Sequence, residues 1–287
     1  MAIFVDKHTQ VLIQGITGRV GSFQAKIMLE YGTRVVAGVT PGKGGTTIHG
    51  IPVYDFVEDA CYHHEIDVAL CFVPARFAKD AAVEAIDNDI PLLVLTSADI
   101  PDHEILQILS FASTKGTRVL GPDTPGLVSP GACKVGVHPN CYLREGSIGV
   151  VSKSGALSYE VCKQLAENGF GQSSVVGIGG GPFWDITYQD VLDRFNNDPE
   201  TQVVILVGEV GGTMEYSAAS FIREGMAKPV ISLIVGRAVP RGTQMGHAGA
   251  IIERDEETAD RKIAALERAG SHIARTPAEI VGLLKTL

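Results

Sequence analysis

Residues 10–32 read QVLIQGITGRVGSFQAKIMLEYG and combine a short apolar run, a glycine-rich turn and an amphipathic stretch. The apolar run predicts a buried strand, and the amphipathic stretch predicts a helix that packs against it. The same succession returns along most of the chain, for example in DVALCFV followed by FAKDAAVEAIDNDI. Repeated units of this kind predict an α/β fold with parallel, doubly wound sheets.

Domains with a single hydrophobic core usually have fewer than 287 residues, so we expect two domains in this chain. Residues 1–125 form the first α/β unit in this interpretation. Residues 126–145 are dense in glycine and proline without a sustained period, which predicts a connecting segment rather than a regular element. Strand and helix patterns then restart, so residues 146–287 are expected to form a second α/β domain that closes with a helix beginning at Thr276-Pro277.

The composition excludes several classes of protein. A net charge of −9 argues against a general binder of nucleic acid or of anionic membranes. The five cysteines form no C-x-x-C pair and their number is odd, so no disulfide framework is indicated and a cytoplasmic location is expected. The histidines show no metal-ligand spacing, and neither a targeting segment nor a membrane span is apparent.

The glycine-rich turn of residues 14–22 offers a site for a phosphate, because backbone N–H groups and the positive end of the following helix meet there. Thr17 stands where the dinucleotide fingerprint has its second glycine, and the next turn carries Lys43 instead of an acidic residue. These departures disfavour NAD and favour another phosphate ligand. The alternative is a tight turn that needs glycine for steric reasons alone.

A second strand-turn-helix segment, GVVSKSGALSYE at residues 149–160, matches neither a P-loop nor a nucleophile elbow. Its Ser154 stands at the expected helix N-terminus. The exposed amides there suit a phosphoryl group or a carboxylate, although a plain N-cap explains the serine equally well.

Two further residues suggest covalent chemistry. Glu209 follows an apolar strand in LVGEVGG, at the strand end where ligands of open α/β sheets gather. A carboxylate at such a place can orient a histidine by accepting its ring N–H. His247 lies among small residues in MGHAGAII, which leave room for a phosphoryl group on the imidazole.

Taken together, these segments resemble the α subunit of succinate–CoA ligase along nearly the whole chain. The segments that carry the resemblance are QGITGRVGS (14–22), VTPGKGGTTIHGIPVY (39–54), GVVSKSGALSYE (149–160), GEVGG (208–212) and MGHAGAII (245–252). The resemblance implies a Rossmann-like first domain that binds coenzyme A and a flavodoxin-like second domain. It also implies a partner, an ATP-grasp β subunit that supplies ATP or GTP and Mg²⁺, in an αβ or α2β2 assembly.

The resemblance also implies roles for single residues. His247 takes a phosphoryl group and passes it to succinate, and coenzyme A attacks the resulting acyl phosphate. Glu209 steadies the imidazole, the helix at Ser154 aims its N-terminus at the phosphohistidine, and Tyr159 lies near the acid. The positions that match coenzyme A contacts are Thr17, Gly18, Arg19, Val20, Lys43, Thr96, Ser97 and Ala98.

Four segments depart from the family's usual sequence. GPDTPG replaces GPNCPG and introduces Asp123 and Thr124, and SADIP replaces TEGIP and puts Ala98 where a glutamate is usual. The loop GGGPFWDITY brings Trp184 beside the expected acid site, and ERDEET after residue 252 predicts a solvated charged face. Malate or another short dicarboxylate therefore stays open as the substrate. A non-catalytic module that binds coenzyme A is the second alternative, and an NAD-dependent oxidoreductase is the third.

Overall fold

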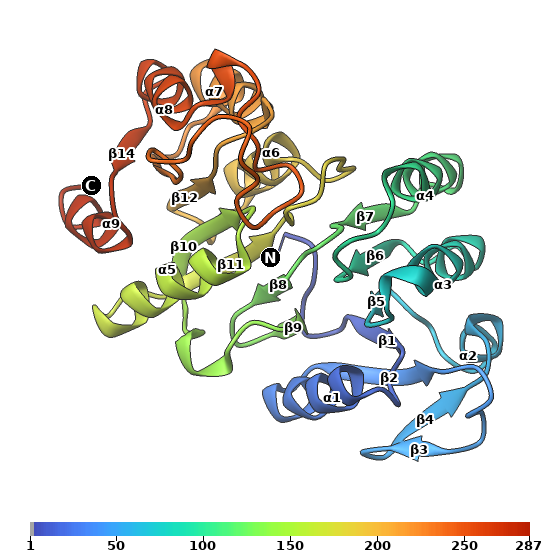
Figure 1. Cartoon of the computed structure of the whole chain (residues 1–287). Coiled ribbons are helices and arrows are strands. Elements are labelled where there is room, and N and C mark those ends of the chain that lie inside the picture. Colours follow the sequence, from blue (N-terminus) through green and yellow to red (C-terminus); the bar gives the residue numbers. More distant parts are fainter. Residues whose placement is uncertain (1–2) are drawn as a thin grey trace.

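A computed structural model describes residues 3–287 of the chain. Its strands form two seven-stranded sheets that lie side by side, and helices cover both (Figure 1). The alternation of strand and helix that the sequence predicts is therefore confirmed. Within residues 3–287, no helix is both long and apolar enough to cross a membrane.

The first sheet has the strand order β3-β4-β2-β1-β5-β6-β7. All neighbouring strands are parallel except β3 and β4, which form a hairpin. Without β3, this is the strand order of a dinucleotide-binding fold. The elements are β1 (Gln10–Gln14), α1 (Arg19–Tyr31), β2 (Arg34–Val39), β3 (Thr47–Ile48), β4 (Ile51–Tyr54), α2 (Val57–His63), β5 (Val68–Cys71), α3 (Ala75–Asp87), β6 (Leu92–Leu95), α4 (Asp102–Lys115) and β7 (Arg118–Leu120).

The second sheet has the order β14-β13-β12-β10-β11-β8-β9. Its five parallel strands follow the flavodoxin-like order, and β8 and β9 extend it as an antiparallel pair. The elements are β8 (Gly126–Ser129), β9 (Cys133–Gly136), η1 (Asn140–Tyr142), β10 (Glu145–Ser152), α5 (Gly155–Glu167), β11 (Gln172–Gly177), α6 (Tyr188–Asn197), β12 (Val203–Gly208), α7 (Met214–Gly225), β13 (Val230–Ile234), η2 (Asp255–Glu257), α8 (Ala259–Arg268), β14 (His272–Ala274) and α9 (Pro277–Leu284).

The expectation that residues 126–145 contain no regular element is wrong, because β8 and β9 lie there. Glycine is needed in these strands because the two backbones lie too close together for a side chain. A Cβ on Gly126 would lie 2.0 Å from the backbone oxygen of Val135, and one on Gly136 would lie 2.2 Å from that of Pro125. The glycine density that indicated a loop thus has a steric cause inside a sheet. Where one domain ends and the next begins remains a prediction.

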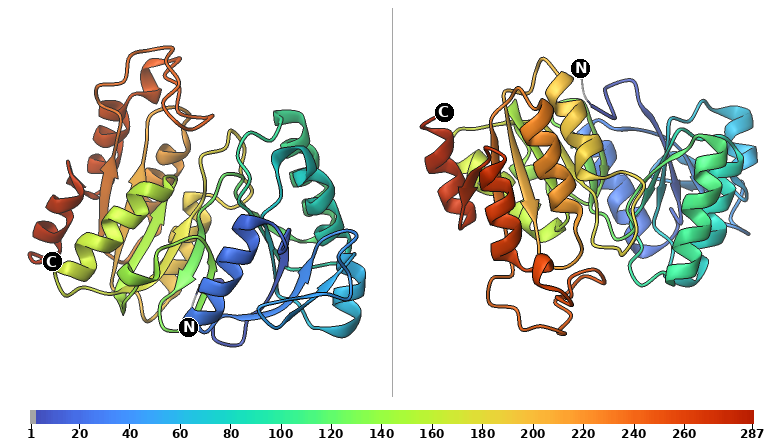
Figure 2. Two further views of the ribbon diagram at one scale, coloured as in Figure 1. Left: turned by 60° about the horizontal axis from the view of Figure 1, so that its bottom comes forward. Right: turned by 90° about the horizontal axis from the view of Figure 1, so that it is seen from above.

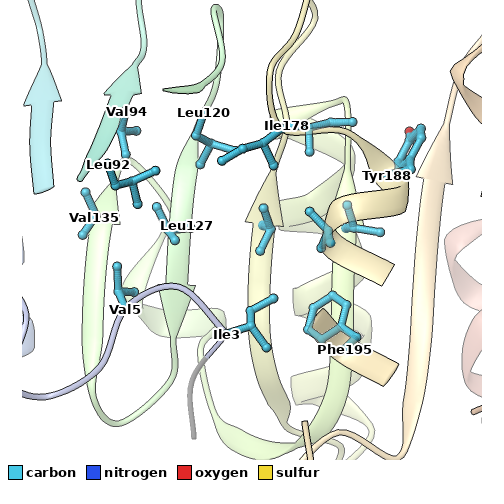
Figure 3. Close-up of a cluster of buried hydrophobic side chains, with 14 of the residues drawn as sticks. Ile3, Val5, Leu92, Val94, Leu120, Leu127, Val135, Ile178, Tyr188 and Phe195 are labelled. Atoms are coloured by element: carbon cyan, nitrogen blue, oxygen red, sulfur yellow. The ribbon is translucent and has the colours of Figure 1, made fainter. Parts of the chain in front are cut away.

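Successive strand residues point to opposite faces of each sheet, and each face has its own helices. Helices α2, α3 and α4 cover the outer face of the first sheet, while α5 and α9 cover one face of the second (Figure 2). The remaining faces, with α1, α6, α7 and α8, share one continuous apolar cluster. Figure 3 shows this cluster, in which Leu120 at the end of the first sheet lies close to Ile178 beyond β11. The two sheets are therefore joined by a common core.

This arrangement directs the loops toward one region. The loops after β1, β2, β6 and β7 all leave the carboxyl edge of the first sheet, because those strands are parallel. The loops after β10, β11, β12 and β13 likewise leave the carboxyl edge of the second. Ligands of open α/β sheets bind outside such edges, so both edges are candidate sites.

Candidate functional site

The expected pairing of histidine and glutamate is present in the structure. Nδ1 of His247 lies 2.7 Å from Oε2 of Glu209, and the side chain of His247 is 23% exposed while that of Glu209 is 8% exposed. Glu209 directly follows β12, and His247 lies in the loop after β13. The glutamate is thus held by a buried strand end, and the histidine reaches it from the neighbouring loop.

The carboxylate determines which ring nitrogen of His247 is available. Because Glu209 has no proton to donate when ionised, Nδ1 carries the hydrogen, and the neutral imidazole keeps the lone pair of Nε2 for a new bond. The hydrogen bond to Glu209 raises the pKa of His247 above its usual value, against the effect of burial. A histidine held in this way has a fixed tautomer, and its Nε2 can act as a nucleophile.

The imidazole of His247 packs closely against the backbone of the loop after β11, at Gly180. A Cβ at Gly180 would lie 2.3 Å from Cγ of His247, so this position in the loop after β11 accepts only glycine without movement of the ring. The loop of His247 is also fixed by backbone hydrogen bonds, from His247 N–H to Met245 O at 3.0 Å and from Ala250 N–H to His247 O at 3.1 Å.

A buried group of charges lies behind Glu209. The carboxylate of Glu215 pairs with Nζ of Lys153 at 3.1 Å and with Nζ of Lys262 at 2.5 Å, and all three side chains are almost fully buried. Lys262 also donates to the backbone oxygen of Glu209 at 2.8 Å and to that of Gly211 at 2.5 Å. We call these three residues the Lys–Glu–Lys cluster. It holds the strand end from which Glu209 reaches the imidazole.

His247 lies between two cavities. The first, of about 310 Å³, lies between the carboxyl edges of the two sheets, and we call it the inter-sheet cavity. Val20 and Thr96 line it from the first sheet, and Gly155, Tyr159 and His247 line it from the second. Burial raises the pKa of Tyr159 to about 12, so its phenol keeps a proton that can be donated into the cavity.

The second cavity has a volume of about 380 Å³. We call it the acidic cavity, because aspartates and no lysine or arginine are among its lining residues in the described part of the chain. Its wall includes Ser97, Ala98, Asp99, Asp102, Asp123, Gln244 and His247.

The structure brings some of the residues predicted to bind coenzyme A to these cavities and leaves others outside. Val20 and Thr96 line the inter-sheet cavity, and Ser97 and Ala98 line the acidic cavity. The hydroxyls of Thr96 and Ser97 donate to backbone oxygens of Cys71 and Val73, each at 2.6 Å, so they shape the loop.

The other predicted residues of the first domain lie in two adjoining turns. Thr17 Oγ1 donates to Thr40 Oγ1 at 3.1 Å, and Thr40 begins the turn that carries Lys43, whose N–H donates to Thr40 O at 3.0 Å. Gly18 is the N-cap of α1 and Arg19 its first residue. Arg19 and Lys43 are exposed, as cations that meet an incoming phosphate need to be.

Ser154 is the N-cap of α5, as one of its two interpretations predicts, because its side chain accepts a hydrogen bond from the N–H of Leu157. The first residue of that helix, Gly155, lines the inter-sheet cavity. The positive end of α5 therefore lies at the same cavity as His247.

The two substituted residues of GPDTPG have different environments. Thr124 is buried. Its hydroxyl donates a hydrogen bond to Gly177 O at 2.5 Å and accepts one from Gly126 N–H at 2.9 Å, so both of its hydrogen bonds are made with the backbone. Asp123 lines both cavities. Burial raises the pKa of Asp123, His247 opposes that rise, and the charges of Asp99 and Glu209 add to it.

Two other departures have structural explanations. The indole N–H of Trp184 donates to Gly179 O at 3.1 Å, and Nζ of Lys153 lies 5.0 Å from the centre of the indole ring, so Trp184 packs against the loop and the Lys–Glu–Lys cluster. In ERDEET, residues 253–256 are exposed as expected. Glu257 is buried instead, because its carboxylate accepts the backbone N–H groups of Glu253 and Arg254.

Sequence reasoning did not find Lys153, Gly180, Glu215 or Lys262 as parts of the site. Lys153 stood in a quoted motif but gave no signal of burial, and Glu215 and Lys262 looked like ordinary charged residues of amphipathic helices. Only the fold brings them together behind Glu209. No sequence spacing predicts such a contact.

Comparisons with known families agree with this arrangement. Residues 6–98 match the model of a CoA binding domain, and residues 151–272 match that of a CoA-ligase. The chain is 50% identical over 281 residues to the succinate–CoA ligase [ADP-forming] subunit alpha 1 of Archaeoglobus fulgidus, covering 98% of this chain and 96% of that protein. It is 47% identical over 282 residues to the corresponding subunit of Aquifex aeolicus, covering 98% and 92%.

The fold is similar to that of a larger enzyme of known structure. The ATP citrate lyase of Methanothrix soehngenii, solved with citrate and coenzyme A, superposes with a TM-score of 0.87 at 25% sequence identity. The match covers 98% of this chain and 51% of that protein, so this chain spans about half of the lyase.

Proposed function

The chain belongs to the family of succinate–CoA ligase α subunits, and from that membership we propose how its own residues take part in the reaction. His247 is the phosphoryl carrier. Nε2 attacks the terminal phosphorus of a nucleoside triphosphate, the bond to the bridging oxygen breaks, and the nucleoside diphosphate leaves. The curated relatives are named ADP-forming, and we propose the same nucleotide pair here.

The second and third steps use the same histidine and then release it. A carboxylate oxygen of the acid attacks the phosphoryl group, the N–P bond breaks, and an acyl phosphate forms. The thiol of coenzyme A then attacks the acyl carbon, inorganic phosphate leaves, and the thiol proton passes to phosphate or solvent. Glu209 accepts the Nδ1 hydrogen bond throughout, which supports the imidazole as phosphoryl acceptor and as leaving group.

One observation carries the proposal: a single cavity has walls from both halves of the chain. Val20 and Thr96, at positions proposed for coenzyme A, line the inter-sheet cavity together with Tyr159 and His247. Phosphate groups held at the turns of Thr17, Arg19 and Lys43 would leave the thiol end free to enter this cavity. Tyr159 and the N-terminus of α5 would then meet the acid and its phosphate.

The nucleotide and Mg²⁺ need a partner. Within residues 3–287, no group of three or more His, Cys, Asp or Glu side chains is placed to hold a metal ion. The relatives are named alpha subunits, and on that ground we assign the nucleotide and its metal to a β subunit of the ATP-grasp type and propose that the two subunits act together in the cytoplasm.

The test is a phosphorylation assay on the chain co-expressed with its β subunit. Incubation with Mg²⁺ and labelled ATP or GTP should give a base-stable, acid-labile phosphate on this chain, and succinate with coenzyme A should discharge it. His247→Ala should abolish the label. His103→Ala is the matched control, because this histidine is exposed on α4 and should not affect it. A folded complex that binds coenzyme A but takes no label would support the non-catalytic module instead.

A further inference from the structure

Asp123 is the residue of the proposed site whose chemistry the reaction leaves unused. It follows β7 and is the one charged residue that lines both cavities on either side of His247, apart from the histidine itself, in the described chain. Its carboxylate accepts no hydrogen bond and forms no ion pair with any residue between 3 and 287. The carboxylate of Glu209, by contrast, is paired with the imidazole.

The backbone holds Asp123 in a defined place. Its φ is 56°, in the left-handed region that aspartate and asparagine tolerate better than most residues. Its N–H donates to Ser97 O at 3.1 Å, and its carbonyl accepts the N–H of Gly180 at 3.4 Å. Gly180 is in turn the residue that lies against the ring of His247. The carboxylate and the imidazole are therefore anchored to the same loop.

Among the described residues that line the two cavities, Gln244, Tyr159 and His247 have side chains that could donate a hydrogen bond toward Asp123, and none of them does so. The acidic cavity contains Asp99 and Asp102 beside Asp123 and no lysine or arginine in its described wall. The neighbouring hydroxyls of Thr124 and Ser97 already donate to backbone oxygens. An ionised carboxylate only accepts hydrogen bonds, so it is satisfied by a ligand that brings its own donor.

We propose that Asp123 is a specificity-determining residue that selects a carboxylic acid carrying a hydroxyl group. The carboxylate accepts the hydrogen bond of that hydroxyl while the neighbouring carboxylate of the substrate faces His247. An acid without a donor meets only the repulsion of a second negative charge at this place. The inference rests on the proposed function.

The experiment uses the complex with the β subunit and pairs of acids that differ by one hydroxyl. The pairs are succinate and malate, glutarate and 2-hydroxyglutarate, and tricarballylate and citrate. We expect kcat/KM to favour the hydroxylated member of at least one pair roughly 10- to 100-fold, the range given by one hydrogen bond to a charged group. Asp123→Asn keeps the size and the backbone preference of the residue, and should reduce that ratio to near one.

Asp99→Asn is the matched control. Asp99 is also an aspartate with a left-handed φ, of 58°, and it lines the acidic cavity without lining the inter-sheet cavity. This variant removes a neighbouring negative charge and should leave the preference for the hydroxylated acid in place. Equal loss of preference in both variants would mean that general charge, and not a contact of Asp123, selects the acid.

Three further outcomes would overturn the inference. If Asp123→Asn lowers kcat/KM for every acid by the same factor, the carboxylate acts in the attack of the coenzyme A thiol and not in the choice of acid. If the wild-type complex shows no preference within any pair, Asp123 pairs with the β subunit or with water. If aspartate is used better than malate, the selected donor is an ammonium group. A complex that forms no phosphohistidine with ATP or GTP refutes the proposed function instead, so the two failures are distinguished.

Discussion

Gly180 lies so close to His247 that a Cβ on the glycine would be 2.3 Å from Cγ of the imidazole. The two residues belong to different loops, after β11 and after β13, and Gly249 N–H donates to Gly180 O at 3.5 Å between them. The ring is therefore confined by the backbone on one side and by the carboxylate of Glu209 on the other. This confinement leaves Nε2 as the ring nitrogen available for the proposed phosphorylation.

Substitution of Gly180 by alanine should move the ring away from Glu209. Its φ is not in the left-handed region, so the backbone accepts alanine and the clash with the imidazole is the main effect. We expect the rate of His247 phosphorylation to fall by about 100-fold, as a displacement of about 1 Å does in active sites. Rapid-quench labelling of the complex measures this rate.

Gly282→Ala is the control for that variant. Gly282 lies in α9 with open space around a built Cβ, so alanine there should leave the labelling rate unchanged and stabilise the helix slightly. Labelling of Gly180→Ala at the wild-type rate would show that the imidazole is not positioned by this contact.

Glu209→Gln should shift the pH dependence of His247 phosphorylation. In the proposed reaction the neutral imidazole is the nucleophile, and the hydrogen bond and charge of Glu209 raise the pKa of His247. Labelling of the wild type should therefore fall as the pH drops through this raised pKa. Glutamine keeps a hydrogen-bond acceptor without the charge, so the acid limb of the profile should move to lower pH, while the maximal rate decreases.

The measurement is the single-turnover labelling rate between about pH 5 and pH 9, the range around the usual pKa of histidine. Glu224→Gln, an exposed glutamate at the end of α7, should leave the profile in place. An acid limb that stays at the same pH in Glu209→Gln would contradict the assignment of the raised pKa to this carboxylate.

The sequence allowed the parallel strands and their covering helices to be predicted, because a buried strand and an amphipathic helix differ in period. It also indicated Glu209, which follows an apolar strand, and His247, which lies among small residues. It did not indicate β8 and β9, because their glycines have a steric role that appears only when Gly126 faces Val135 across two strands. The glycine content of a segment does not show how closely two strands will pack in the fold.

The Lys–Glu–Lys cluster escaped prediction for a related reason. Glu215 and Lys262 lie on α7 and α8, where charged residues usually face solvent, and Lys153 lies in the turn between β10 and α5. Their burial follows from the ion pairs that Glu215 makes with the two lysines next to the end of β12, and no single segment of the sequence predicts these pairs. The same holds for Asp123, which the sequence marked as unusual without showing that it lines two cavities.

Glu215→Gln should strongly destabilise the fold. Burial acts to raise the pKa of Glu215, but Lys153 and Lys262 outweigh it and hold the pKa below its usual value. The carboxylate is therefore charged at neutral pH, and its removal leaves two buried ammonium groups without a counter-charge. We expect a loss of about 3–5 kcal/mol in the free energy of unfolding. Urea unfolding at pH 7, followed by circular dichroism, measures it.

The pH dependence of this loss has a definite sign. A carboxylate with a lowered pKa in the fold contributes stability above its unfolded pKa, and loses it as the pH falls through the folded value. The difference between wild type and Glu215→Gln should therefore shrink in acid. Glu30→Gln, in an exposed pair with Lys26 at 3.9 Å, should change stability little at any pH. A similar small effect of Glu215→Gln would mean that the two lysines are not charged.

Lys134→Met should stabilise the fold at neutral pH. Lys134 is 1% exposed, and burial lowers its pKa from 10.5 to about 8. Below that pH the lysine is charged in both states and its burial costs free energy. Between about pH 8 and 10.5 the unfolded chain holds a proton that the folded chain has released, so wild-type stability rises with pH. A shift of this size corresponds to at most about 3 kcal/mol.

Methionine has a similar shape without the charge, so the variant should be more stable than the wild type by about 1–3 kcal/mol at pH 7. The lower end of this range allows for the lost hydrogen bond from Lys134 Nζ to Asn140 Oδ1, which is 2.8 Å long. The advantage should shrink between about pH 8 and 10.5 and vanish above pH 10.5, where the lysine is neutral in both the folded and the unfolded chain. Urea unfolding at several pH values tests this, and a variant less stable than the wild type at pH 7 would show that the buried ammonium stabilises the fold.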